Sequence, residues 1–374
     1  MRVASQDLVV EPATSDDDPA IQRLLASISV PGRVVLTFER SPSYFASCEP
    51  LGPLCQVLVA RQRRDGGVVA VAARAVRPVF VNGQVEEVGY ITDLRVDPRF
   101  RGRWLTWRFL RGLRELHADG RVRGYLAVIA EENAEARGVL VDHPRPNLPT
   151  FREIGRLTSL ALLLRRPKPP LDSPHAVSRA TRADLPEIVG FLGRHGAVRQ
   201  FFPLYTEEDF APGSRRTLGF EIEDLHLARR GGELVGVLGL WDRSGSKQTV
   251  VQAYTGLAHW GRPFYDVGAR LAGARPLPGP GQRVALAYAS FICVAENDLG
   301  VFRALLRETW SLAASRGYSH LVVGLVEDDP LLAEARRYIH LAYHSRLYTV
   351  CWEHERYFHD RLDGRPPYVD TASV

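Results

Sequence analysis

The chain has 374 residues, of which 45% are hydrophobic and 24% charged, and its net charge is +5. It is long enough for two compact domains of about 150 residues each, and its composition excludes a disordered or fibrous protein. The sequence contains no apolar run of about 18 residues, so we predict no membrane span. It also lacks a basic run interleaved with aromatic residues, so we predict no nucleic-acid partner.

Cysteine and lysine usage bear on the compartment and on the ligand. Four cysteines without metal-ligand spacing are present, namely Cys48, Cys55, Cys293 and Cys351. They require no disulfide, and the N-terminus lacks the apolar core of a signal peptide, so we predict a cytoplasmic protein without a metal. Lys168 and Lys247 are the only lysines. Nearly all positive charge is therefore arginine, which suits an anionic ligand or partner.

The first elements alternate between strand and helix patterns. Leu8–Glu11 has the pattern of a short strand, and Thr14 or Ser15, with acidic residues after it, marks the start of a helix. The same pattern returns at Thr181. Apolar runs at 57–61 and 68–76, separated by a Gly-Gly pair, predict two further strands.

The stretch 89–117 has the pattern of a strand, a short basic loop and a helix. Tyr90–Val96 alternates and carries β-branched residues, which predicts a strand, and Pro98 ends it because proline cannot extend the ladder. From Leu105 to Leu116 the apolar residues recur on one face of a helix.

The loop between this strand and helix has the features of an anion site. Arg99, Arg101 and Arg103 surround Gly102, which lets the backbone approach a ligand closely. The first turn of a helix leaves backbone N–H groups without partners and carries partial positive charge. We therefore predict that a diphosphate binds here. A surface turn with solvated arginines is the alternative interpretation.

The segment Val96-Asp-Pro-Arg99-Phe-Arg-Gly102-Arg103 resembles the acyl-CoA loop of the GNAT N-acyltransferase superfamily, whose pattern is (Gln/Arg)-x-x-Gly-x-(Gly/Ala). Arg99 and Gly102 match this pattern. Trp104 stands at the last position, where the family has a small residue that leaves room for the pantetheine diphosphate. The resemblance implies a cosubstrate, acetyl-CoA or a longer acyl-CoA.

The elements of the first half return in the same order in the second half. Strand patterns recur at 176–179, 225–229, 234–241 and 289–294. Gly300 stands where Gly102 stood, but Glu296 and Asn297 replace the basic character of the loop, so this loop repels a diphosphate. We predict an α/β protein made of two tandem GNAT-like domains with mixed sheets, of which only the first keeps the cofactor loop.

The repeat also predicts the domain organisation. We expect an N-terminal domain over 1–164, a proline-rich linker over 165–175 and a degenerate second domain over 176–353. Residues 354–374 are expected to form a C-terminal tail. Because His354 and His359 lack metal-ligand spacing, this tail is interpreted as solvated.

The resemblance implies where the cofactor binds. The end of the central strand, with Leu94, Arg95 and Val96, is expected to splay away from the next strand and to bind pantetheine. Further contacts are expected from the loop and helix start, at Arg99, Phe100, Arg101, Gly102, Arg103, Trp104 and Leu105. Asn133 follows the next strand and is either another cofactor contact or a helix cap.

Three residues of the central strand are candidates for the chemistry. Asp93 is the candidate general base, and a structural carboxylate paired with Arg95 or Arg101 is the alternative. Glu87 is a second carboxylate that is a candidate for the general base. Tyr90 either lines the acceptor pocket or packs in the sheet. The tyrosine that the family often carries after Asn133 is absent. A water or a tyrosine from elsewhere, such as Tyr44 or one of the second half, then protonates the thiolate.

We therefore predict an N-acyltransferase that moves an acyl group from a CoA thioester to an amine by direct attack. One alternative, motivated by Trp104, is an acyl-carrier-protein donor with a peptide or natural-product amine as acceptor. Another is a non-catalytic acyl-CoA-binding scaffold. The expected partners are a small-molecule or peptide amine, with an acyl carrier protein and a homodimer left open.

Overall fold

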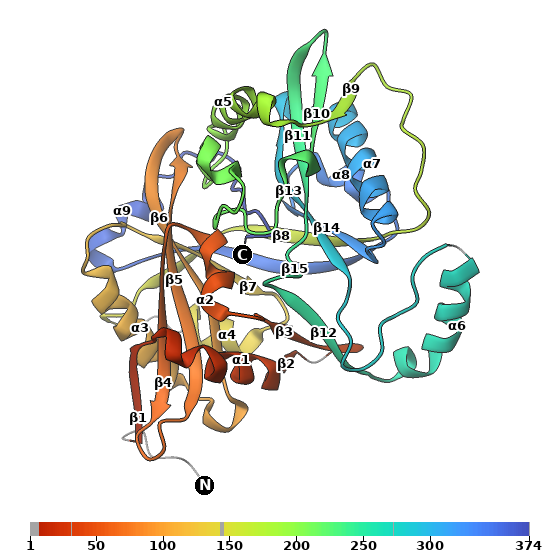
Figure 1. The fold of residues 1–374 in the computed structure, drawn as a ribbon. Helices are drawn as coiled ribbons and strands as arrows, with labels where there is room; N and C mark the ends of the chain where they lie inside the picture. The colour runs from red at the N-terminus through yellow and green to blue at the C-terminus, as the bar shows by residue number, and fades with distance from the viewer. Residues whose placement is uncertain (1–6, 31, 143–145, 272, 374) are drawn as a thin grey trace.

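The computed structural model describes residues 7–30, 32–142, 146–271 and 273–373 (Figure 1). A 12-stranded mixed sheet runs through both halves. Its strands lie side by side in this order: β1 (Leu8–Pro12), β4 (Leu54–Gln62), β5 (Val68–Val81), β6 (Gln84–Val96), β7 (Tyr125–Ala130), β15 (His340–Cys351), β8 (Thr150–Leu163), β14 (His320–Val326), β13 (Leu286–Val294), β11 (Glu233–Trp241), β10 (Leu225–Arg230) and β9 (Ala176–Arg179).

Helices lie around this sheet, except that α6 stands apart from it beyond β12 (Gln248–Tyr254) (Figure 1). They are α1 (Asp18–Ser27), α2 (Tyr44–Cys48), α3 (Arg103–His117), α4 (Ala134–Leu140), α5 (Leu185–Gly196), α6 (Leu257–Leu271), α7 (Leu299–Ser315), α8 (Leu332–Ala335) and α9 (Tyr357–Asp360). Among the helices in the described ranges, none combines the length and the hydropathy that crossing a membrane requires.

The duplication is visible in matching local details. Thr14 forms a capping box with Asp17 before α1, and Thr181 forms the same box with Asp184 before α5. This confirms the helix starts predicted from the sequence and the repeat of the pattern. The predicted mixed α/β fold with two GNAT-like copies is likewise confirmed.

The last strand of each half lies beside strands of the other half. β8, which ends the first half, pairs antiparallel with β14 over Leu157–Leu163. β15, which ends the second half, pairs antiparallel with β7 of the first half and with β8. Figure 1 shows these two strands crossing the middle of the molecule. The two halves therefore share one continuous hydrogen-bonded sheet.

A second, three-stranded sheet also joins the halves. It consists of β12 (Gln248–Tyr254), β3 (Val34–Glu39) and β2 (Ser29–Val30), and β12 of the second half pairs antiparallel with β3 of the first. In this register Gln248 lies opposite Glu39. The residues just after β3 and just before β12 are consequently neighbours.

Both central strands carry the same backbone irregularity. The pairing of β6 with β5 shifts register at Ala73, and Asp93 there has φ +52°. The pairing of β13 with β11 shifts between Val237 and Gly239, and Phe291 has φ +56°. A positive φ is rare outside glycine, so each copy holds a strained bulge at the same place in its central strand.

The prediction of a solvated C-terminal tail is wrong for most of that segment. Phe358 is 1% exposed, Tyr368 4% and Ala372 0%. His359 is also buried, and its ring nitrogens contact the hydroxyls of Thr150 and Thr349. The physical reason is that apolar residues spaced through the segment fill the join between the halves, while His354 and polar positions such as Asp360 and Asp363 stay at the surface.

Candidate functional site

The predicted diphosphate loop forms a short 3-10 turn, Pro98–Phe100, followed by α3 with Gly102 at the N-cap. Gly102 has no side chain to cap the helix, and the first intrahelical bond runs from Leu105 N to Gly102 O at 3.2 Å. Arg101 and Gly102 are exposed. The N–H groups of the first turn therefore face an accessible surface, as an anion site requires.

The arginines of this loop are partly engaged with acids. The Arg99 guanidinium donates to Asp97, with Nη2 2.6 Å from Oδ2, while its side chain is 81% exposed. These hydrogen bonds from Arg99 lower the pKa of Asp97. Arg101 lies 3.5 Å from Glu135. The side chain of Arg103 lies outside the described part of the structure. An incoming phosphate would compete with exposed, weak ion pairs.

Trp104 packs beside the loop and the end of the central strand. Its indole lies with Phe100, Leu94 and Val96 against an apolar cluster that β1, β4, β5 and α3 form, and the Arg108 guanidinium carbon lies 5.5 Å from its ring centroid. A Cβ on Gly102 would lie 3.1 Å from Trp104 Cδ1. Leu105 is fully buried in the same cluster. Trp104 thus supports the loop and the end of the central strand.

The central strand splays from its neighbour, as the resemblance implied. β6 pairs in parallel with β7 only over Gly89–Ile91. Beyond that point Arg95 and Val96 pair with β5 alone within the described residues. Leu94, Arg95 and Val96 are half-buried. Backbone groups of this stretch that face β7 lack a ladder partner and are available to a ligand.

Asn133 is the N-cap of α4. Its side-chain oxygen accepts from Ala136 N at 3.0 Å, and the residue is exposed. The helix-cap interpretation is therefore confirmed, and a cofactor contact by its amide nitrogen stays a prediction.

Asp93 is surrounded by groups that the sequence did not connect with it. Arg40 Nη2 lies 3.4 Å from Oδ1, and the Tyr44 hydroxyl lies 3.5 Å from Oδ2. The side chain of Asp93 is 8% exposed. Burial opposes its ionisation, but the charges of Arg40 and Arg95 outweigh burial and lower the pKa of the carboxyl. The sequence predicts Arg95 or Arg101 as the ion-pair partner of Asp93, but the structure places Arg40 in that position.

Tyr90 joins this group and Glu87 does not. Tyr90 is buried, and burial with the nearby charge of Asp93 raises the pKa of its phenol. It also lines a small cavity of about 30 Å³, bordered by Arg77, Phe201 and Asp370. Glu87 is exposed, six residues before Asp93, where β6 pairs with Pro78. The structure therefore separates Glu87 from the open end of the central strand.

The second half contributes further buried cations beside Asp93. Lys247, just before β12, donates to Thr371 O at 3.2 Å, and its Nζ lies 5.1 Å from the Tyr288 ring centroid. Burial and the charge of Arg40 lower the pKa of Lys247 well below its ordinary value. Arg243 Nη2 donates to Ser47 O at 3.2 Å. Burial, followed by the charge of Arg40, lowers the pKa of Arg243 to about 10.

Two of these guanidiniums are incompletely satisfied. Arg40 Nη1 and Arg243 Nε and Nη1 are buried and have no hydrogen-bond partner among the described residues. Arg243 has no carboxylate at ion-pair distance in the described part of the chain. Buried polar groups without partners are uncommon, and at a functional site they indicate a missing ligand or water.

Sequence reasoning had named Tyr44 as a source of the missing tyrosine but had missed Arg40, Arg243 and Lys247. A signal for Lys247 was present, because it is one of only two lysines in an arginine-rich chain. Arg40 and Arg243 carried no such signal. Both come from connections between elements whose proximity depends on the pairing of β12 with β3.

A groove of about 380 Å³ runs along the same helix that begins at Gly102. It is lined by Trp107, Arg111 and Arg114 of α3 and by Pro146, Asn147 and Leu148 of the loop that precedes β8. An aromatic ring beside two guanidinium groups is a surface that suits a nucleotide base with a phosphate.

The equivalent cleft of the second copy is filled. Phe291, at the bulge, is fully buried among Tyr205, Phe220 and Trp241, and its N–H donates to Asp370 Oδ2 at 3.1 Å. A Cβ on Gly324 of β14 would lie 2.1 Å from Thr371 Cγ2, so the C-terminal segment occupies the space beside that strand.

The loop of the second copy is closed by its own side chains. Asp298 caps α7 by accepting from Gly300 N at 2.8 Å and from Val301 N at 3.2 Å. Asn297 Oδ1 accepts from Arg199 at 2.7 Å. The amides that would hold a phosphate are thus used by the protein, as the acidic sequence predicted.

The fold and these two clefts define a tandem GNAT architecture, intact in the first copy and degenerate in the second. A scan against known protein families finds no match, and no curated protein matches the chain in sequence. Solved structures do match. A Saccharomyces cerevisiae N-myristoyltransferase with bound myristoyl-CoA, itself a tandem GNAT fold, superposes with TM-score 0.62 at 9% identity, covering 93% of this chain and 83% of that one.

Two structures described as GCN5-related N-acetyltransferases are similar as well. A GCN5-related N-acetyltransferase from Sphaerobacter thermophilus matches with TM-score 0.58 at 14% identity over 100% of both chains. A GCN5-related glucosamine N-acetyltransferase region of a fungal β-N-acetylglucosaminidase matches with TM-score 0.59 at 14% identity, covering 92% of this chain and 38% of that one. At these identities the comparisons show the fold.

Proposed function

We propose that the protein is an N-acyltransferase that transfers an acyl group from a CoA thioester to an amine. The observation that carries this proposal is the asymmetry of the two clefts. Beside the bulged strand β6, the backbone is unpaired toward β7 and leads to an exposed, uncapped helix start. In the fold family this arrangement receives pantetheine and diphosphate, and the similar N-myristoyltransferase was solved with myristoyl-CoA bound.

In the proposed binding mode each part of the cofactor meets a different feature of the first copy. The diphosphate lies on the first-turn amides after Gly102, and the pantetheine lies along Leu94–Val96. The adenine and the 3′-phosphate lie in the groove formed by Trp107, Arg111 and Arg114, which begins about 6 Å along the helix from Arg103. The thioester then lies close to Asp93.

In the proposed chemistry, Asp93 remains ionised and attracts the acceptor amine, because Arg40 holds its pKa low. The ammonium first gives one proton to solvent. The amine nitrogen then bonds to the thioester carbon and gives a second proton to the Asp93 carboxylate, and the C–S bond breaks with its electron pair on sulfur. Burial keeps the Tyr44 phenol protonated, since its pKa is raised well above the ordinary value. Tyr44 is therefore the group placed to protonate the departing thiolate. The products are an amide and free CoA.

The acceptor side is built from both halves. The buried, unpartnered N–H groups of Arg40 and Arg243 favour an acceptor with an anionic group beside its amine, such as an amino acid or the carboxyl end of a short peptide. The adjoining cavity of about 30 Å³ holds roughly one water. The segment Tyr368–Asp370 that borders it must therefore move when an acceptor enters.

The test is release of free CoA thiol, followed with a thiol reagent, for acetyl-, octanoyl- and myristoyl-CoA against neutral amines and amino acids. We expect saturable release with at least one donor and a preference for acceptors that carry a carboxylate. Calorimetric titration with the same donors is run in parallel. Binding without release on any acceptor would favour the acyl-CoA-binding scaffold, and absence of binding would contradict both.

The carrier-protein alternative stays a prediction, because the Trp104 ring lies beside Gly102 and packs with Leu94 and Val96. It is tested by comparing an acyl-CoA with the same acyl chain on a carrier protein. A reducing compartment such as the cytoplasm fits the four free thiols.

A further inference from the structure

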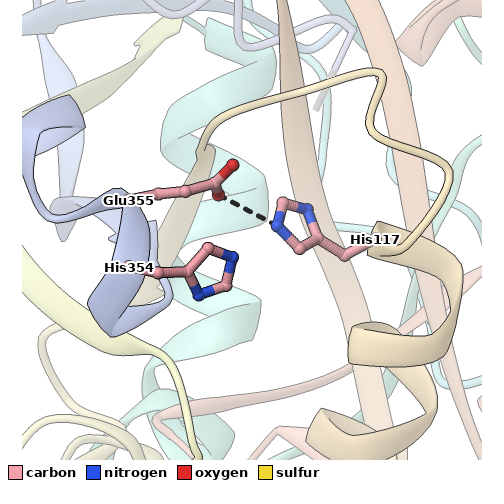
Figure 2. A group of neighbouring side chains, drawn as sticks. All are labelled: His117, His354 and Glu355. Carbon is pink, nitrogen blue, oxygen red and sulfur yellow. Dashed lines mark ion pairs between the residues drawn. The ribbon is translucent and has the colours of Figure 1, made fainter.

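A second group of polar side chains lies at the opposite end of α3 from the cofactor loop. His117 is the last residue of α3, and His354 and Glu355 belong to a 3-10 turn, Glu353–Glu355, that follows β15. His117 Nε2 lies 2.9 Å from Glu355 Oε2, and one ligand atom from each of the three residues lies within 4.8 Å of the others. Figure 2 shows the two imidazoles and the carboxylate converging on one space.

The ring of His117 is held in place from the other side. Its Nδ1 lies 3.0 Å from the Tyr125 hydroxyl, which in turn accepts from Arg74 Nε at 3.1 Å. The ring also stacks on Trp352, with centroids 4.4 Å apart and planes at 17°. A hydrogen bond on the second nitrogen and a fixed ring plane are what orient a metal-binding histidine.

The contact between His117 and Glu355 is not a well-formed hydrogen bond. Glu355 Oε2 is buried and lacks a hydrogen-bond partner in the described structure, although it lies 2.9 Å from His117 Nε2. The roles of the two ring nitrogens depend on the tautomer. In the tautomer whose Nδ1 donates to Tyr125, Nε2 presents a lone pair to the carboxylate. Two electron-rich atoms then face each other, and a cation between them removes the conflict.

We propose that His117, His354 and Glu355 bind a divalent transition-metal ion of the zinc class. Two nitrogens and one carboxylate oxygen form a donor set that zinc accepts, with bonds of about 2.0–2.1 Å. Ligand atoms on one such tetrahedral ion lie about 3.3–3.4 Å apart. The His117–Glu355 pair, at 2.9 Å, therefore has to open by about 0.4 Å to hold the ion. His354 is exposed, so its side chain can rotate toward the other two ligands. Three protein ligands leave the fourth position of the ion to water.

The proposed ion joins the two halves. One ligand comes from the first half's helix, and two follow the last strand of the second half, which itself pairs with β7. The cofactor loop lies about 22 Å away along the 15 residues of α3. The ion therefore does not contact the reacting atoms. It stabilises the folded chain, because it binds the native state and not the unfolded one.

The experiment uses the full chain after removal of metals with a chelator. Zn²⁺ is titrated by calorimetry, Co²⁺ is added to record the visible absorption of a coordinated ion, and thermal unfolding is followed with and without Zn²⁺. We expect one site per chain, a raised unfolding temperature, and affinity that His354→Ala and Glu355→Gln each weaken by at least about tenfold. His259→Ala, at another exposed histidine, serves as the matched control.

His354→Ala separates the proposal from a purely structural ion pair, because this residue is exposed and makes no contact that the fold requires. If the wild type and His354→Ala bind Zn²⁺ equally, or if Zn²⁺ shifts the unfolding temperature of neither, the proposal is overturned. The readouts do not depend on acyl transfer, so they stand or fall separately from the proposed function.

Discussion

The two central strands of this protein have the same bulge but opposite surroundings. In the first copy the bulge residue is Asp93, and the strand ends beside an uncapped, exposed helix start. In the second copy the bulge residue is Phe291, and the helix start is capped by Asp298. The difference shows that the fold alone does not make a site, since one backbone leaves an accessible cleft in the first copy and forms a filled core in the second.

The second copy contributes charged groups to the surroundings of the first copy's central strand. Its own cleft is filled by aromatic rings and by the C-terminal segment, while its Lys247 lies near Asp93 and its Arg243 donates to Ser47 O of the first half. A cleft that no longer binds a ligand can be packed with apolar side chains, which stabilises the shared sheet. We infer that loss of one cleft and growth of the other are linked through the shared strands.

Placing a charge at the two equivalent glycines tests the comparison with the largest expected effect. Gly102→Glu puts a carboxylate where the diphosphate is proposed to bind, so we expect acyl-CoA affinity to fall by at least about 100-fold. Gly300→Glu, the matched change beside an already capped loop, is expected to leave affinity unchanged. Calorimetric titration with acyl-CoA measures both, and equal losses in the two variants would contradict the asymmetry.

Removing the bulge carboxylate is expected to have the next largest effect. Asp93→Asn leaves Arg40 buried without its ionised partner, which costs about 3 kcal/mol of unfolding free energy, and abolishes most acyl transfer. The double change Arg40→Met with Asp93→Asn should restore much of the stability but not the turnover. Urea unfolding and thiol release distinguish these outcomes, and full activity of the double variant would remove Asp93 from the proposed chemistry.

The two copies also differ in their response to acid. His226 on β10 stands where the first copy has Leu58, and burial lowers its pKa to about 4. The unfolded state binds the proton first, so stability is lost as pH falls from about 6.5 toward 4, by about 2 kcal/mol at pH 5. His320 has a pKa lowered to about 4 for the same reason.

His226→Leu makes this position of the second copy resemble the first. We expect its unfolding free energy to change less between pH 8 and pH 5 than that of the wild type. The absolute stability at pH 8 falls by about 1 kcal/mol, because the Thr309 hydroxyl loses its partner 3.1 Å away. Urea unfolding at both pH values measures this, and an unchanged pH slope would show that His226 titrates normally.

The smallest effect is expected at Trp104. Trp104→Ala restores a small residue at the family's last loop position, but the indole packs in the apolar cluster of β1, β4, β5 and α3. Acyl-CoA affinity should therefore change by less than about threefold, with a modest loss of stability from lost packing. A large gain in affinity would show that the indole obstructs the cofactor.

Local sequence patterns predicted much of the fold. Thr14 and Thr181 predicted matching helix starts, and the alternation in Tyr90–Val96 predicted the central strand. Both predictions succeeded because capping and periodicity depend on neighbouring residues. The basic loop at Gly102 predicted an open helix start in the first half, and the acidic loop before Gly300 predicted a closed one in the second half. Asn133 was correctly offered as a helix cap, since its side chain reaches only three residues along the chain.

The contents of the site depended on distant pairings that no local pattern states. Arg40 meets Asp93 from 53 residues away, and Lys247 arrives because β12 pairs with β3. The C-terminal segment was misjudged for the same reason, since burial of Tyr368 and Ala372 depends on a groove formed by two other strands.

The sequence by itself determined the duplicated architecture, the exposed basic loop before α3 and the acidic character of the matching loop in the second half. These properties are written in short stretches whose conformation follows from their own side chains. Only the tertiary structure decided which charges surround Asp93, that β8 and β15 are shared between the halves, and that His117 meets His354 and Glu355. Such contacts arise when packing brings remote segments together, so they cannot be predicted from the residues of either segment alone.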